Sequence, residues 1–175
     1  MEPSQVHFSP IHPGVRIGHV NLKVADLDRA LGFYCGVLGF NLVQRYGAQA
    51  AFVSAGGYHH HIGLNTWQSG GGSPPPQRAT GLYHLAILYP DRAQLADAVR
   101  RVLAAGVILA GAADHGVSEA IYLQDPDGNG VELCCDRPPT QWPRDEDGQL
   151  AMFSKPLDVA VLLSSNPPSR GRSVS

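Results

Sequence analysis

The sequence predicts an α+β fold in which two βαβββ modules form a curved, barrel-like mixed sheet with the helices on the outside. Three observations predict it: a strand-and-helix pattern that occurs twice, an amphipathic stripe in each helix, and three strand-like runs after each helix. The length of 175 residues suits one domain or two small modules that share a core.

The internal repeat is the clearest of these observations. Residues 17–24 (IGHVNLKV) and residues 82–89 (LYHLAILY) both read as a strand, and both lead into an acidic helix start. His19 and His84 occupy the same place in the two copies. Because such a repeat indicates two copies of one supersecondary unit, matching positions are expected to have matching surroundings.

Each copy continues into a helix with recognisable ends. Asp26 and Asp91 are suited to cap the two helix starts, and Gly39 and Gly106 to end the helices in a left-handed conformation. Apolar residues recur with a 3.6-residue period and predict one buried stripe per helix. The stripes are Leu27, Ala30, Leu31, Tyr34, Val37 and Leu38 in the first helix and Leu95, Ala98, Val99, Val102 and Leu103 in the second.

Three strand-like runs follow each helix, and a strong turn signal (DPDGN, residues 125–129) separates the last two. The runs are residues 40–46, 50–54 and 58–66 in the first copy and 107–110, 119–124 and 130–136 in the second. The predicted organisation is an N-terminal arm (1–14), a single domain (15–137, with module one at 15–67, a linker at 68–80 and module two at 81–137), an extension (138–163) and a disordered tail (164–175). Apolar residues expected to dock the extension on the body are Trp142, Leu150, Met152, Phe153 and Leu157.

Composition excludes several classes of function. The formal net charge of -2 attracts neither nucleic acid nor an anionic membrane surface. The sequence has no run approaching the roughly 18 apolar residues of a membrane span, and its first residues lack signal-peptide features. The three cysteines form no CxxC pair, which indicates reduced thiols and a cytoplasmic protein.

Strand alternation gathers polar side chains on one face of the predicted sheet. Residues such as Val20 and Leu22 in the first strand, Tyr83, Leu85 and Ile87 in the first strand of the second copy, and Val131 and Leu133 in the last strand are expected to pack on the helices, so the residues between them point away. The face opposite the helices then collects His19, His61, His84, Tyr122 and Glu132. Two imidazoles and one carboxylate are the ligand set of a facial triad on non-haem Fe(II), and they also suit an open Zn(II) site.

Other chemistry has little support. No GxSxG, Walker-type or GxGxxG sequence occurs. His115, in the turn-like run DHGVS, reads equally well as an ordinary loop histidine. Residues 59–61 (HHH) also read as a surface tract, and alternation predicts that His60 points to the face opposite His61. The strand histidines and Glu132 therefore carry the functional prediction.

Three stretches of this sequence resemble a known protein family. The run GHVNLKVADLDRA, with the later FY and LGF, resembles the opening module of the vicinal-oxygen-chelate superfamily, which includes glyoxalases, bleomycin-resistance proteins and extradiol dioxygenases. The run DPDGNGVEL resembles its closing strand pair, so the likeness covers about residues 17–137. Residues 55–67 (AGGYHHHIGLNTW), residues 114–122 (DHGVSEAIY) and the extension are most similar to catechol 2,3-dioxygenase-like proteins.

The resemblance implies roles for particular residues. In type I extradiol dioxygenases a His, a His and a Glu bind Fe(II), which matches His19, His84 and Glu132 here. A fourth-strand His serves as acid/base, a Tyr contacts the substrate oxygen, and a loop His precedes that Tyr, and the matching residues are His61, Tyr122 and His115. The expected cofactor is one divalent metal, Fe(II) first, with Mn(II), Zn(II) or Ni(II) as alternatives.

The resemblance favours extradiol cleavage of a catechol-type small aromatic by O2. Two other functions stay open: another metalloenzyme of the superfamily (glyoxalase-, epimerase- or isomerase-like), and a metal-free protein that binds a drug or other small molecule. Many such dioxygenases carry two module pairs where this chain carries one, and glyoxalase I-type enzymes place a carboxylate on the fourth strand, where this chain has Gly63 and Asn65. We expect a homodimer or a compact closed monomer, with a complete site inside each chain.

Overall fold

The computed structural model describes residues 9–76 and 78–165, and it contains two modules, each with its own mixed sheet. In module one the strands are ordered β1-β4-β3-β2, and β1 and β4 run parallel. The elements of module one are β1 (Val20–Lys23), α1 (Leu27–Leu31), the π-helix η1 (Gly32–Val37), β2 (Asn41–Tyr46), β3 (Ala50–Ser54) and β4 (Ile62–Asn65).

Module two repeats this plan and adds one strand from the extension. Its order is β5-β8-β7-β6-β9, and β5 and β8 form the parallel pair. The elements of module two are β5 (Leu85–Tyr89), α2 (Arg92–Ala104), β6 (Gly111–Asp114), β7 (Ser118–Gln124) and β8 (Gly130–Asp136), and the extension adds the 3-10 helix η2 (Pro139–Gln141), β9 (Lys155–Pro156) and α3 (Val159–Leu163).

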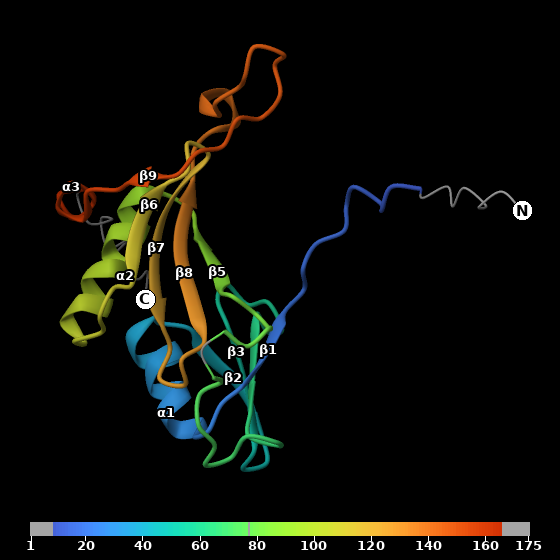
Figure 1. Ribbon diagram of the computed structural model, residues 1–175. Coiled ribbons are helices and arrows are strands. Elements are labelled where there is room, and N and C mark those ends of the chain that lie inside the picture. Colours follow the sequence, from blue (N-terminus) through green and yellow to red (C-terminus); the bar gives the residue numbers. More distant parts are fainter. Residues whose placement is uncertain (1–8, 77, 166–175) are drawn as a thin grey trace, which may run out of the picture.

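The predicted fold class is confirmed. The two sheets are curved and do not close into a barrel, and α1 and α2 lie on the same side of them (Figure 1). Both predicted N-caps are present, because Asp26 accepts from the Arg29 amide and Asp91 from the Gln94 amide. The stripe predicted for the first helix splits between α1 and the π-helix, and Gly39 follows with φ +87°.

Several predicted strand limits are wrong. The run at 107–110 is not a strand, because it carries the chain from α2 to the sheet, and β6 begins only at Gly111. The first strand of each module begins later than predicted, at Val20 and at Leu85, since parallel pairing with the neighbouring strand starts there. Tyr83 was expected to pack on the helix, but it precedes the paired segment and is 89% exposed.

The turn between β7 and β8 locks the two modules together. The buried Tyr34 hydroxyl donates to Asp125 Oδ2 at 3.0 Å, and burial together with the Asp125 carboxylate raises the pKa of Tyr34. Asp127 Oδ1 accepts from the Arg29 guanidinium at 2.7 Å and from the Ala25 amide at 2.8 Å. Because these carboxylates are buried and their bonds charge-assisted, separating the modules would cost several such bonds.

The extension docks on module two. β9 pairs with β6, and Leu162 of α3 is fully buried against the core. The predicted disorder is wrong for its first two residues, 164 and 165, because Arg100 Nη2 donates to the carbonyl of Ser165 at 2.6 Å. The rest of the predicted tail, 166–175, and residues 1–8 of the predicted arm lie outside the described residues. No helix among the described residues is long and apolar enough to cross a membrane.

Candidate functional site

His84 and Glu132 form the centre of the candidate site. Glu132 lies in the middle of β8 on the face away from α2, between the buried Val131 and Leu133, as strand alternation predicts. His84 directly precedes β5, and its Nε2 lies 2.8 Å from Glu132 Oε2. A Cβ on Gly130 would collide with the carbonyl of the residue before His84, so glycine at this position lets β8 approach the His84 backbone.

The chemistry of this pair suits a cation. The Glu132 side chain is only 11% exposed, so an unpaired negative charge there would be costly. Glu132 Oε2 can only accept, so at 2.8 Å His84 Nε2 either donates its own N–H to the carboxylate or, without that proton, lies beside it as a second ligand of a cation. His84 Nδ1 is buried without a hydrogen-bond partner among the described residues. The pair therefore fits two adjacent ligands of a divalent metal.

Tyr122 and His115 extend the site from the neighbouring strand. Tyr122 lies on β7 and is paired in register with Glu132 of the adjacent strand β8. The centroid of the Tyr122 ring lies 5.7 Å from that of His84. The Tyr122 hydroxyl lies 2.7 Å from His115 Nε2. Burial raises the pKa of Tyr122, and the Glu132 carboxylate raises it further. Tyr122 therefore stays a phenol at neutral pH and can donate a hydrogen bond.

His61 belongs to module one and has a defined tautomer. It directly precedes β4, and its carbonyl accepts from the Val20 amide at 3.1 Å. Its Nδ1 accepts from the Ala55 amide at 3.3 Å and lies 2.9 Å from Ser54 Oγ. Because a backbone N–H can only donate, Nδ1 is the acceptor and neutral His61 carries its proton on Nε2.

His19 lies apart from the pair in module two. It precedes β1, and its ring centroid is 4.3 Å from that of His60. His60 was predicted to point to the opposite face, and this is wrong, because residues 58–61 form a loop in which strand alternation does not hold. The His60 ring also lies 5.0 Å from Phe52, and burial, followed by the neighbouring histidine His19, lowers the pKa of His60.

A cavity of about 850 Å³ connects the two modules. Three of the predicted residues, His19, His61 and His84, line it, and most of the remaining lining is apolar. Its lining residues come from the two modules, among them Val20 and Phe40 from module one and Leu85 and Tyr89 from module two. The cavity is large enough for a small aromatic molecule.

The structure thus assembles the predicted residues in two groups. His84, Glu132, Tyr122 and His115 come together in module two, whereas His19 and His61 lie in module one. Among residues 9–76 and 78–165, no three His, Cys, Asp or Glu side chains form a group that could hold a metal. The expectation of a complete triad inside one chain is not met, since buried contacts at the turn 125–129 fix the modules in this relation.

Sequence reasoning missed three residues that shape the site. Ser54 contacts His61, and Phe153 contacts His115 through its carbonyl. Gly116 lies in the run DHGVS, which the sequence indicated only as a turn. In the structure it has φ +76° and is closely packed. Burial, together with the neighbouring Glu132 carboxylate, raises the pKa of the Cys134 thiol to about 12.

Known proteins resemble this chain over most of its length. A catechol-2,3-dioxygenase of Bacillus subtilis is 39% identical over 168 residues, which is 95% of this chain and 58% of that protein. A probable lactoylglutathione lyase of Synechocystis sp. is 28% identical over 120 residues, 66% of this chain and 91% of that protein. The solved structure of a glyoxalase/dioxygenase from Nostoc punctiforme has a TM-score of 0.60 at 23% identity, over 76% of this chain and 100% of that chain.

A family model matches the two modules themselves. It covers residues 16–133, from just before β1 to the middle of β8, and thus includes His19, His61, His84, Tyr122 and Glu132. This match spans more than half of the sequence and agrees with the two-module fold. The chain belongs to the Glyoxalase/Bleomycin resistance protein/Dioxygenase superfamily.

Proposed function

We propose that the chain is a metal-dependent extradiol dioxygenase that opens the ring of a catechol-type small aromatic with O2. The observation that carries the proposal is the placement of the Tyr122–His115 pair beside the His84–Glu132 pair on one sheet face. A phenol and an imidazole next to candidate ligands suit a substrate whose hydroxyls must lose and regain protons. The similarity to a catechol-2,3-dioxygenase supports the substrate class.

The proposed ligands are His19, His84 and Glu132, with Fe(II) as the metal. Two of them already lie side by side, and the third lies across the cavity in module one. Bringing His19 of the same chain onto the pair would break the contacts of Tyr34 and Arg29 with the β7–β8 turn. We therefore propose a homodimer in which module one of a second copy supplies His19.

Each residue of the chain has a separate task in this reaction. A bound Fe(II) would supply Lewis acidity and a place where catecholate and O2 meet. Tyr122, whose hydroxyl lies against His115 Nε2, can orient a substrate hydroxyl by accepting a hydrogen bond from it. The apolar cavity excludes water from the ring and strengthens these polar contacts.

His61 is proposed as the group that returns a proton. Its Nδ1 is occupied by the Ala55 amide, so the proton of the neutral ring is on Nε2. In this form Nε2–H can donate a hydrogen bond to a substrate oxygen, but transfer of that proton would leave an imidazolate. To return a proton His61 must first become an imidazolium, which requires that Nδ1 takes up a proton and that its contact with the Ala55 amide opens.

A lyase-like reaction is the second candidate, since lactoylglutathione lyases are among the relatives. In β4 the positions that follow His61 on the same face are Gly63 and Asn65. Asn65 is held by bonds to Asn21 Oδ1 and the Leu22 carbonyl and offers no carboxylate. This observation favours ring cleavage over the lyase reaction.

The test is turnover by iron-loaded protein. The chain would be loaded with Fe(II) without oxygen, mixed with a panel of catechols and then exposed to O2, while the yellow ring-opened product and O2 uptake are followed. We expect both signals with wild type and neither with His84→Ala. A parallel reaction would be supplied with glutathione and methylglyoxal; lactoylglutathione formed there, with no catechol consumed in the first assay, would favour the lyase reaction and contradict the proposal.

A further inference from the structure

The loop between β6 and β7 is held by the C-terminal extension. Two contacts join His115 of this loop to Phe153 of the extension. The Phe153 amide donates to the His115 carbonyl at 3.3 Å, and the ring nitrogen His115 Nδ1 lies 3.1 Å from the Phe153 carbonyl oxygen. The other ring nitrogen of His115 faces the Tyr122 hydroxyl at 2.7 Å. A chain of contacts thus runs from the extension to the candidate site.

These contacts fix the tautomer of His115. A peptide carbonyl can only accept, so Nδ1 must carry the proton. Neutral His115 then presents a lone pair at Nε2, and the Tyr122 hydroxyl donates to it. Because the Tyr122 hydroxyl donates its proton to this hydrogen bond, the Tyr122 oxygen can accept a hydrogen bond from a group in the site.

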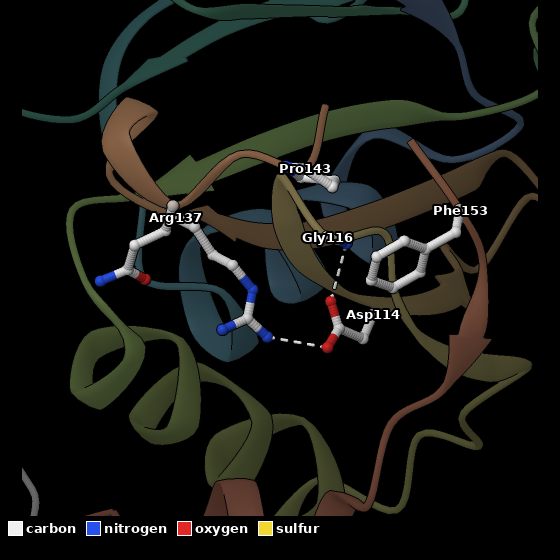
Figure 2. Close-up of a pocket in the computed structure, with 6 residues that line it drawn as sticks. Asp114, Gly116, Arg137, Pro143 and Phe153 are labelled. Atoms are coloured by element: carbon white, nitrogen blue, oxygen red, sulfur yellow. Dashed lines mark hydrogen bonds and ion pairs between the residues drawn. The ribbon is translucent and has the colours of Figure 1, made fainter. Parts of the chain in front are cut away.

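Close packing at Gly116 holds the carbonyl in this place. Gly116 has φ +76°, and a Cβ there would lie 2.6 Å from Phe153 Cε1 and 2.8 Å from Pro143 Cγ. Asp114 accepts from the Gly116 amide at 2.8 Å and is itself bound by Arg137 at 2.8 Å. Figure 2 shows the Phe153 ring and Pro143 beside Gly116. With Asp114 and Arg137 they line a small cavity of about 270 Å³.

We propose that Phe153 and Gly116 are positioning residues, through which the extension holds His115 as the Nδ1–H tautomer and so directs the Tyr122 hydroxyl away from the substrate. The part of this inference that concerns substrate rests on the proposed function. If the Phe153 ring is removed, the carbonyl loses its fixed place. His115 can then carry its proton on Nε2 and donate to Tyr122, which turns the phenol proton toward the site.

The first experiment reads the tautomer without any reaction. Long-range ¹H–¹⁵N NMR on the full chain, with the His115 signals assigned by His115→Gln, distinguishes the two tautomers. We expect Nδ1–H in wild type, and Nε2–H or a mixture in Phe153→Ala and in Gly116→Ala. Phe153→Leu, which keeps an apolar side chain, should restore Nδ1–H at least in part. The matched control is Met152→Ala, whose side chain is 64% exposed one residue away, and it should leave the tautomer unchanged.

The second experiment separates this inference from the proposed function. In iron-loaded protein, Phe153→Ala should lower kcat by ~10-fold, the scale expected for loss of an outer partner, with metal content and KM near wild type. Wild type and all variants could fail to turn over a catechol although the tautomer shifts as expected. The proposed function would then fail, and the positioning role would stand. Nε2–H in wild type, or Nδ1–H retained in both Phe153→Ala and Gly116→Ala, would overturn the positioning role itself.

Discussion

Module two and module one carry matching histidines with different surroundings. His84 meets the carboxylate of Glu132 on the parallel neighbour strand, whereas the ring of His19 lies beside the ring of His60. By register, the residue of β4 that corresponds to Glu132 of β8 is Gly63, which pairs with Asn21 as Glu132 pairs with Ala86 and has no side chain to offer. The repeat therefore gives the two histidines matching backbone positions. The side chains of the neighbouring strand determine which contacts each imidazole makes.

The two sheets also differ in how they are covered. In module two, the extension adds β9 at the edge of the sheet, next to β6. In module one, all six residues of the edge strand β2 are exposed, including Leu42, Val43 and Tyr46. Module one therefore presents an uncovered, partly apolar sheet edge, whereas the corresponding edge of module two is covered by the extension.

The largest expected effect breaks the pair in module two. Glu132→Gln keeps the size of the side chain but removes the charge that a divalent metal needs, so most bound metal should be lost. The measurement is metal content after purification and dialysis. Asp136→Asn, which neutralises an exposed carboxylate four residues along the chain, is the matched control and should keep its metal. Full occupancy in Glu132→Gln would remove Glu132 from the ligand set.

The next effect concerns module one. His61→Ala should lower catechol turnover by ~100- to 10,000-fold, the usual contribution of a general acid, with metal content near wild type. His59→Ala is the control, because His59 is exposed in the same tract, and its turnover should stay close to wild type. Loss of metal in His61→Ala would instead make His61 a ligand and favour a lyase-like site.

A smaller effect tests the lock between the modules. Tyr34→Phe removes the hydroxyl that donates to the buried Asp125 carboxylate, which should lower the free energy of unfolding by about 1.5–3 kcal/mol. Urea unfolding measures this difference, and Tyr46→Phe, at a 65% exposed position, should change it little. A Tyr34→Phe protein as stable as wild type would show that this bond does not hold the modules.

Much of this arrangement was predictable from the sequence, and the misses have physical causes. Alternation around Val131 and Leu133 correctly placed Glu132 on the face away from the helix, because that strand is fully paired. The same reasoning failed for His60, since backbone outside the paired segment does not alternate. The contact between His115 and the Phe153 carbonyl could not be predicted. The two residues lie in loops 38 positions apart, and such a contact leaves no periodic pattern in the sequence.

The central claim is that one metal joins His19 of one copy to His84 and Glu132 of another. His19→Ala and Glu132→Ala chains carrying different tags would be co-expressed, and the mixed dimer purified for metal analysis. Each variant by itself should be nearly metal-free, whereas the mixed dimer retains one intact ligand set and should hold about half of the wild-type metal. A mixed dimer as empty as its parents would contradict the account and return the site to a single chain, and full occupancy in His19→Ala would remove module one from the site.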